Sequence, residues 1–174
     1  DVPAIVSGFG NVAYTTTAGL YRDAYVFAAS TDTLLVVYEN TVQGSVRCSY
    51  RTDTASTWTD VQVFSHFGVT GSVYTTGARA CGLELPSGRL LVFYAIEDAS
   101  ASTVNVGMSY SDTDGATWTR GQTGCLEAAI STTSQSIRRM RAAYLAGQIV
   151  LMVDVVDTST AYSQRMAQYA SADL

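Results

Sequence analysis

Three arginines recur at the start of similar segments and are the residues of this chain best suited to bind an anion. They are Arg22, Arg79 and Arg138, and an apolar run follows each of them. A guanidinium offers paired N–H donors in a planar fork that matches a carboxylate. We therefore expect the three arginines to bind a ligand carboxylate if the fold brings them together. The alternative is that each recurs only because its segment recurs, and pairs with a carboxylate or carbonyl of a neighbouring loop.

Acidic residues follow the same apolar runs and are the candidate catalytic groups. They are Glu39, Glu97, Asp98, Asp154 and Asp157. Two carboxyl groups can act as general acid and base on a glycosidic bond. Glu97 and Asp98 are weak candidates for this role, because an adjacent acidic pair more often lies in a solvated loop than in a catalytic site. We therefore assign no catalytic residue. The single histidine, His66, has no partner to activate and is a poor candidate base.

Composition limits the partners and cofactors that we expect. The formal net charge is −5, and all ten basic residues are arginine, which argues against nucleic acid as a partner. We expect no membrane span, because no stretch has the required length and apolarity. One histidine and no Cys-x-x-Cys pair argue against a zinc site, and we expect no metal and no cofactor.

The three cysteines are an odd number with no metal-like spacing. Cys48 is expected to be a small apolar core residue, because the corresponding position of the next repeat holds Met108. Cys81 and Cys125 could pair within one repeat if the protein is secreted, and the sequence leaves that open.

An internal repeat determines which elements position these residues. Trp58 and Trp118 lie in matching surroundings, with Val, Ser, Tyr, Thr and Gln recurring at the same offset. The apolar runs 34–38 and 90–94 also match, and 149–153 matches more faintly. The chain therefore holds about three units, near 6–63, 64–121 and 122–174, within one segment that covers 1–174. Each unit must stack on a neighbour to bury its apolar face.

The middle unit is predicted to form four antiparallel strands. The expected strands are 79–85, 89–95, 104–111 and a short strand from Trp118, with a turn at 86–88, a polar loop at 96–103 and a turn at 114–115. Four-stranded sheets arranged radially are the blades of a β-propeller, so the predicted fold is all-β. The three arginines would then begin the innermost strands, near the central axis.

The turn before each tryptophan resembles the Asp-box (BNR repeat) of sialidase-like β-propellers, whose pattern is Ser/Thr-x-Asp-x-Gly-x-Thr-Trp. The matching or nearby positions are Asp53, Thr57 and Trp58 in the first unit, Ser111, Asp114, Gly115, Thr117 and Trp118 in the second, and Ser171 and Asp173 in the third. We expect a structural role: the acid accepts backbone N–H bonds, glycine supplies positive φ, and tryptophan packs between sheets.

The resemblance implies a fold more firmly than an activity. Sialidases clamp a sugar carboxylate with three arginines and open their first blade with Arg-Ile-Pro, whereas the segment 21–24 lacks the Ile and Pro. The loop 40–44 has no aspartate where the family carries an acidic catalyst, and no tyrosine–glutamate nucleophile pair is identifiable. Three blades do not close a ring, so the remaining blades are expected from the rest of a longer polypeptide, which we favour, or from other copies.

Three functions are consistent with these observations. The leading expectation is a non-catalytic propeller segment of a secreted or particle-surface protein that binds glycans or neighbouring subunits. The first alternative is part of a sialidase-type exo-glycosidase whose other catalytic residues lie outside this chain. The second alternative is a purely structural repeat array that mediates assembly.

Overall fold

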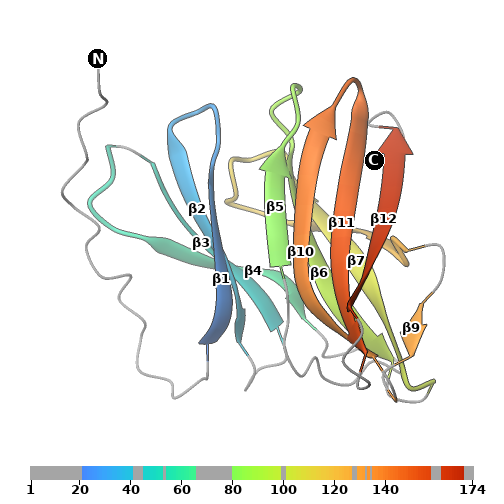
Figure 1. The fold of residues 1–174 in the computed structure, drawn as a ribbon. Helices are drawn as coiled ribbons and strands as arrows, with labels where there is room; N and C mark the ends of the chain where they lie inside the picture. Colours follow the sequence, from blue (N-terminus) through green and yellow to red (C-terminus); the bar gives the residue numbers. More distant parts are fainter. Residues whose placement is uncertain are drawn as a thin grey trace.

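The protein folds entirely as antiparallel β-structure within the residues that the computed structural model describes (Figure 1). These residues are 21–40, 45–52, 54–65, 80–98, 101–126, 129–131, 133, 135–157 and 162–170. The side chains of 21–23, 97–98, 122–123 and 162–170 are not described. No helix in these ranges is long and apolar enough to cross a membrane.

Twelve strands make up the described part. They are β1 (Tyr21–Ala28), β2 (Thr33–Asn40), β3 (Ser45–Thr52), β4 (Thr59–Ser65), β5 (Ala80–Glu84), β6 (Leu90–Asp98), β7 (Thr103–Ser111), β8 (Thr119–Thr123), β9 (Ile130–Ser131), β10 (Gln135–Leu145), β11 (Gln148–Asp157) and β12 (Tyr162–Ala170). Each strand is paired with its neighbour in sequence within three separate sheets, β1–β4, β5–β8 with β9 beside β7, and β10–β12. The expected all-β architecture is confirmed.

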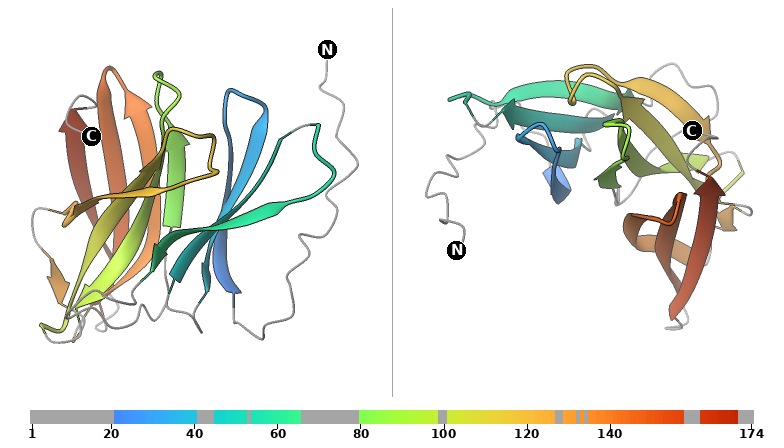
Figure 2. Two further views of the ribbon diagram at one scale, coloured as in Figure 1. Left: turned by 180° about the vertical axis from the view of Figure 1, so that it is seen from behind. Right: turned by 90° about the horizontal axis from the view of Figure 1, so that it is seen from above.

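The three sheets follow one another around an arc, which Figure 2 shows from above. The first strand of each sheet lies toward the inside of the arc, where β5 has β1 on one side and β10 on the other. We call the sheets blade 1, blade 2 and blade 3. Their order along the chain is their order in space, as in a β-propeller.

The predicted polar loop at 96–103 is largely wrong, because the strands on either side extend into it. β6 continues to Asp98 and β7 begins at Thr103, with Glu97 opposite Val104 and Asp98 opposite Thr103. Backbone pairing with β7 keeps this segment in the ladder although Glu97 and Asp98 are polar. The candidate acids Glu97 and Asp98 therefore end a strand instead of occupying a loop.

Blade 2 is buried on both faces, which explains the nearly continuous apolar run of β6. Leu90, Val92 and Tyr94 lie in the core shared with blade 1. Leu91 and Phe93 lie in the core shared with blade 3, and all five side chains are fully buried. Alternate residues of one strand thus join the two cores.

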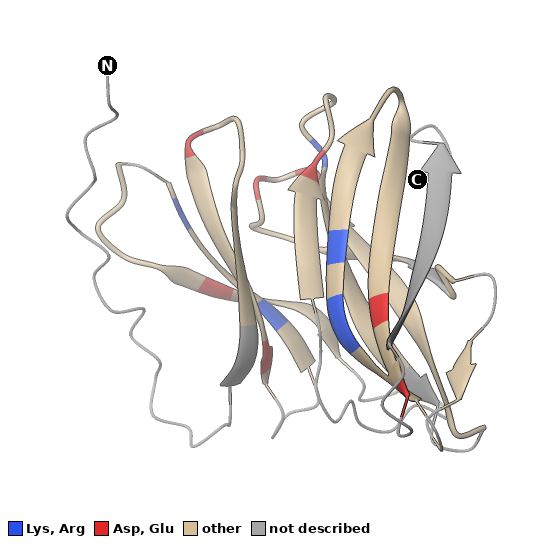
Figure 3. Cartoon of the chain, viewed as in Figure 1, with Lys and Arg blue, Asp and Glu red and all other residues tan. Residues whose placement is uncertain are grey.

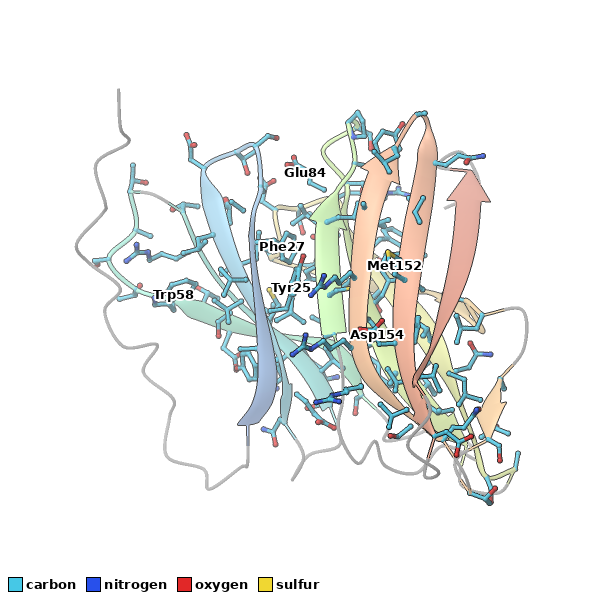
Figure 4. The ribbon with its side chains drawn as sticks, in the orientation of Figure 1. Tyr25, Phe27, Trp58, Glu84, Met152 and Asp154 are labelled. Carbon is cyan, nitrogen blue, oxygen red and sulfur yellow. The ribbon has the colours of Figure 1, made fainter. Side chains whose placement is uncertain are left out.

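A glycine allows blades 1 and 2 to approach closely. A Cβ placed on Gly82 in β5 would lie 2.4 Å from the ring carbon Cε1 of Phe27 in β1. Figure 4 shows Phe27 between these two strands. The same junction holds the rings of Phe64 and Tyr94, which stack with centroids 4.6 Å apart. The junction is therefore a close-packed core that an added methyl group would disturb.

Replacement of this glycine should destabilise the fold. We expect Gly82→Ala to cost about 1–3 kcal/mol, since the Phe27 ring must move. For a domain of this size, each kcal/mol lowers the Tm by roughly 2–4 °C in a thermal melt. In a Phe27→Ala background the same change should be close to neutral, because the ring is gone. An equal loss in both backgrounds would show that the contact does not limit the approach of the blades.

Candidate functional site

The innermost strands of the three blades line a cavity of about 450 Å³, a size typical of ligand sites. Its lining residues are Ala24 and Tyr25 of β1, Ala80 of β5, and Arg138, Arg139, Met140 and Arg141 of β10. Figure 4 labels Tyr25 where β1 faces β5. Figure 3 shows the basic positions of β10 beside an acidic position of β11. The cavity therefore combines positive charge with a phenol.

A β-bulge explains how β10 presents two adjacent arginines. The pairing of β10 with β11 shifts between Ile137 and Arg139, so Arg138 is an extra residue in the ladder. Ile137 and Met140 remain in the core, whereas Arg138 and Arg139 are both exposed. Without the bulge, strict alternation would turn Arg139 toward the core.

An acid stands opposite an arginine at equivalent places in blades 1 and 3. Arg139 pairs in register with Asp154, and Arg22 pairs in register with Glu39. Glu39 is only 2 % exposed and Asp154 is half-buried. The register therefore makes Arg139, and not Arg138, the structural equivalent of Arg22.

Of the three arginines proposed from the sequence, the structure places Arg138 in the cavity. Arg22 begins β1, but its side chain lies outside the described residues, as does the whole of Arg79. Sequence reasoning missed Arg139 and Arg141. The run 138–141 holds three arginines around one methionine, and this density of charge within a predicted strand was the available signal.

Tyr25 contributes a hydroxyl that remains protonated at neutral pH. Burial raises the pKa of the Tyr25 phenol, nearby Cys81 adds to the rise, and the positive charge of Arg141 partly offsets it. A protonated phenol can both donate and accept a hydrogen bond. The cavity thus offers a neutral polar group beside its arginines.

The cysteines are structural. All three thiols are free and buried, so Cys81 and Cys125 do not form the disulfide that the sequence left open. Burial raises the pKa of each thiol to about 12, which keeps it protonated and unreactive. Within the described ranges, no three His, Cys, Asp or Glu side chains gather as metal ligands.

Hydroxyl groups, rather than the expected acid, organise the turn at 111–118, the second predicted Asp-box. Ser111 Oγ accepts N–H bonds from Thr113 at 3.2 Å and from Gly115 at 3.0 Å. Thr113 Oγ1 accepts the N–H of Thr117 at 2.9 Å. Gly115 has φ +88°, and the indole of Trp118 donates to its carbonyl at 3.0 Å. Thr113 stands where the predicted pattern has its aspartate.

Asp114 instead reaches the neighbouring blade. Its carboxylate accepts a hydrogen bond from the hydroxyl of Thr31 at 3.1 Å, at the turn between β1 and β2. A Cβ on Gly115 would lie 2.8 Å from Leu35 Cδ2, so the turn also packs closely on blade 1. This turn therefore ties blade 2 to blade 1.

The other two boxes are described only in part. Trp58 is half-buried, and the guanidinium of Arg51 lies 5.4 Å from its ring centroid. Thr57 is exposed. Asp53, Ser171 and Asp173 lie outside the described residues, so their roles stay predictions.

Comparison with solved structures identifies the fold as that of β-propellers. No protein-family model and no curated protein matches the sequence. The chain is similar to a mutant α-L-arabinofuranosidase from Fusarium graminearum in complex with an iminosugar inhibitor, with 16% identity, a TM-score of 0.62, and 84% of this chain and 45% of that chain covered. It is also similar to a Penicillium chrysogenum α-L-arabinanase complexed with arabinobiose, with 14% identity, a TM-score of 0.55, and coverage of 87% and 50%.

A third similar structure is a fucose lectin from Kordia zhangzhouensis in complex with methyl-fucoside. The identity is 13% and the TM-score 0.51, with 86% of this chain and 97% of that chain covered. The chain thus spans about half the length of the two hydrolases but nearly all of the lectin chain. At these identities the likeness shows the fold alone, and a specific relation to sialidases stays a prediction.

The turn hydrogen bonds predict a stability effect. Ser111→Ala removes the acceptor of two N–H groups at a residue that is 1 % exposed. We expect a loss of about 1–3 kcal/mol in the free energy of unfolding, measured by urea denaturation. The matched change at exposed Ser131 should stay within about 0.5 kcal/mol. Equal effects at both sites would contradict the role assigned to Ser111.

Proposed function

We propose that this chain is a non-catalytic β-propeller segment that binds an acidic glycan in the cavity at its innermost strands. The observation that carries the proposal is the presence of Arg138, Arg139 and Arg141 in one cavity lining. Three like charges close together repel one another, and an anionic ligand relieves that repulsion. A carboxylate or sulfate of a saccharide supplies such an anion.

The cavity chemistry supports a saccharide over a small inorganic anion. Guanidinium groups fix the acidic substituent through paired N–H donors, while the Tyr25 hydroxyl is available to a sugar hydroxyl. A volume of about 450 Å³ exceeds the needs of a simple ion. The similar structures hold an iminosugar inhibitor, arabinobiose and methyl-fucoside, which favours carbohydrate as the ligand class.

Binding without catalysis is favoured by the chemistry of the lining. Glycoside hydrolysis generally requires two carboxyl groups that flank the bond. The described lining holds arginines, a tyrosine and apolar side chains. Asp154 stands opposite Arg139 on the adjacent strand, where it can orient the guanidinium. A glycan-binding role also accords with a secreted or surface-exposed protein, which is part of this proposal.

The test is binding of a uronic-acid oligosaccharide and of its neutral counterpart, measured by calorimetry. We expect preference for the acidic ligand and an affinity loss of about 10–100-fold for Arg141→Gln, the range for a hydrogen bond to a charged group. Arg120→Gln is the matched control, because Arg120 lies over the Phe64 ring, away from the cavity. Equal affinity of both variants, or equal binding of both ligands, would overturn the proposal.

An exo-glycosidase is the second candidate. The likeness to an α-L-arabinofuranosidase at a TM-score of 0.62 favours it. This candidate expects release of a terminal sugar from aryl glycosides, with turnover abolished by Asp154→Asn. Such turnover would replace the non-catalytic proposal, whereas binding without turnover supports it.

A further inference from the structure

The face of blade 3 that points away from blade 2 is built like a face that packs against another blade. The apolar runs of the three units align so that Leu35, Leu91 and Val150 are equivalent. Leu35 and Leu91 are fully buried against the following blade. Val150 is only half-buried, because the described chain places no further blade against it.

The same difference in burial recurs two residues further along each strand, at the next position on this face. Val37 and Phe93 are fully buried, whereas their equivalent Met152 is half-buried (labelled in Figure 4). The acids also correspond, since Glu39 is buried at the junction of blades 1 and 2 and its equivalent Asp154 lies on the open face. The open face of blade 3 thus repeats the chemistry of a face that is covered in blade 1.

Blade 1 presents the complementary face, which is exposed at β1 although Val36 and Tyr38 of β2 are buried on it. Val26 of β1 is 53 % exposed and pairs in register with Val36. In blade 2, the residue equivalent to Val36 is Val92, and Val92 pairs with Gly82. Val26 therefore occupies in blade 1 the place that Gly82 occupies in blade 2. That place is the one contacted by the preceding blade through Phe27.

Side-chain sizes at this contact position fit a junction between blade 3 and blade 1. Within the chain, the large Phe27 packs on Gly82. At the next junction the equivalent positions hold Leu83 and Ala142, again large against small, in one shared core. At the open faces the equivalent positions hold Ala143 of blade 3 and Val26 of blade 1, and both are exposed. The pair again joins a small residue to a larger one, with the small residue now on the preceding blade.

We propose that two copies of this chain close a six-bladed ring, with the open face of blade 3 of each copy packed on the open face of blade 1 of the other. A head-to-tail contact of this kind closes when the rotation between subunits completes a ring. Two copies also supply about one full chain of the matched hydrolases, of which this chain covers 45% and 50%. The ring places β1 of the second copy beside β10 and so adds a wall to the arginine-lined cavity.

The first experiment measures the mass of the 174-residue chain by light scattering over a range of concentrations. We expect a species of twice the 18.5 kDa chain mass. Met152→Glu should abolish it, because a carboxylate would be buried without a partner at the junction. Thr119→Glu, on the outer strand of blade 2, should leave the dimer intact, and circular dichroism verifies that both variants fold.

The second experiment tests the contact itself and does not depend on a disruptive change. Chains with Val26→Cys and chains with Ala143→Cys are mixed and treated with a short bis-maleimide. We expect covalent dimers from the mixture and several-fold less from either variant alone, because the contact joins unlike positions. The native thiols are buried and should not react.

Three outcomes would overturn the proposal: a monomer at all concentrations, a species of three copies, or equal cross-linking of each variant with itself. A monomer would leave the open faces for further blades or for another protein. The mass is measured without ligand, so failure of glycan binding would not affect this result.

Discussion

The face-to-face burial of neighbouring sheets is the constraint on which this fold depends. A twisted antiparallel sheet with apolar residues on both faces is stable only when each face meets another sheet. Blade 2 meets this condition through β6, whose alternate residues enter two different cores. The closeness of the sheets is set by small residues, above all Gly82 under the Phe27 ring. The arrangement of the cavity follows from this packing.

The cavity results from a local irregularity placed on that regular frame. The innermost strands are the edges of their sheets, where bulges are tolerated because one side of the ladder is unpaired. The bulges in β1 and β10 use this freedom, and the one in β10 turns Arg138 and Arg139 outward together. The two arginines are exposed on the edge strand β10, whereas Glu39, which lies on the inner strand β2 of blade 1, is buried. The edge position of β10 therefore allows its arginine side chains to reach solvent.

The turn at 111–118 has a second role beyond closing a hairpin. Its internal hydrogen bonds are made by the hydroxyls of Ser111 and Thr113, which leaves the Asp114 carboxylate available to bind Thr31 of blade 1. The turn thereby also holds a contact between blades 1 and 2. A motif that looks local in sequence thus contributes to the spacing of the sheets.

The sequence by itself determined the repeat, the strand class and the turn positions, because strand alternation, glycine and aromatic spacing are properties of short segments. From these signals it also predicted the radial arrangement of sheets and the place of Arg138 on an innermost strand. The tertiary structure decided that Arg139 and Arg141 join Arg138, that β6 extends through Asp98, and that the hydroxyl of Thr113 accepts a turn N–H bond where an acid was expected. Those features depend on cross-strand register and on close approach between sheets, and both are set by partners distant in the chain.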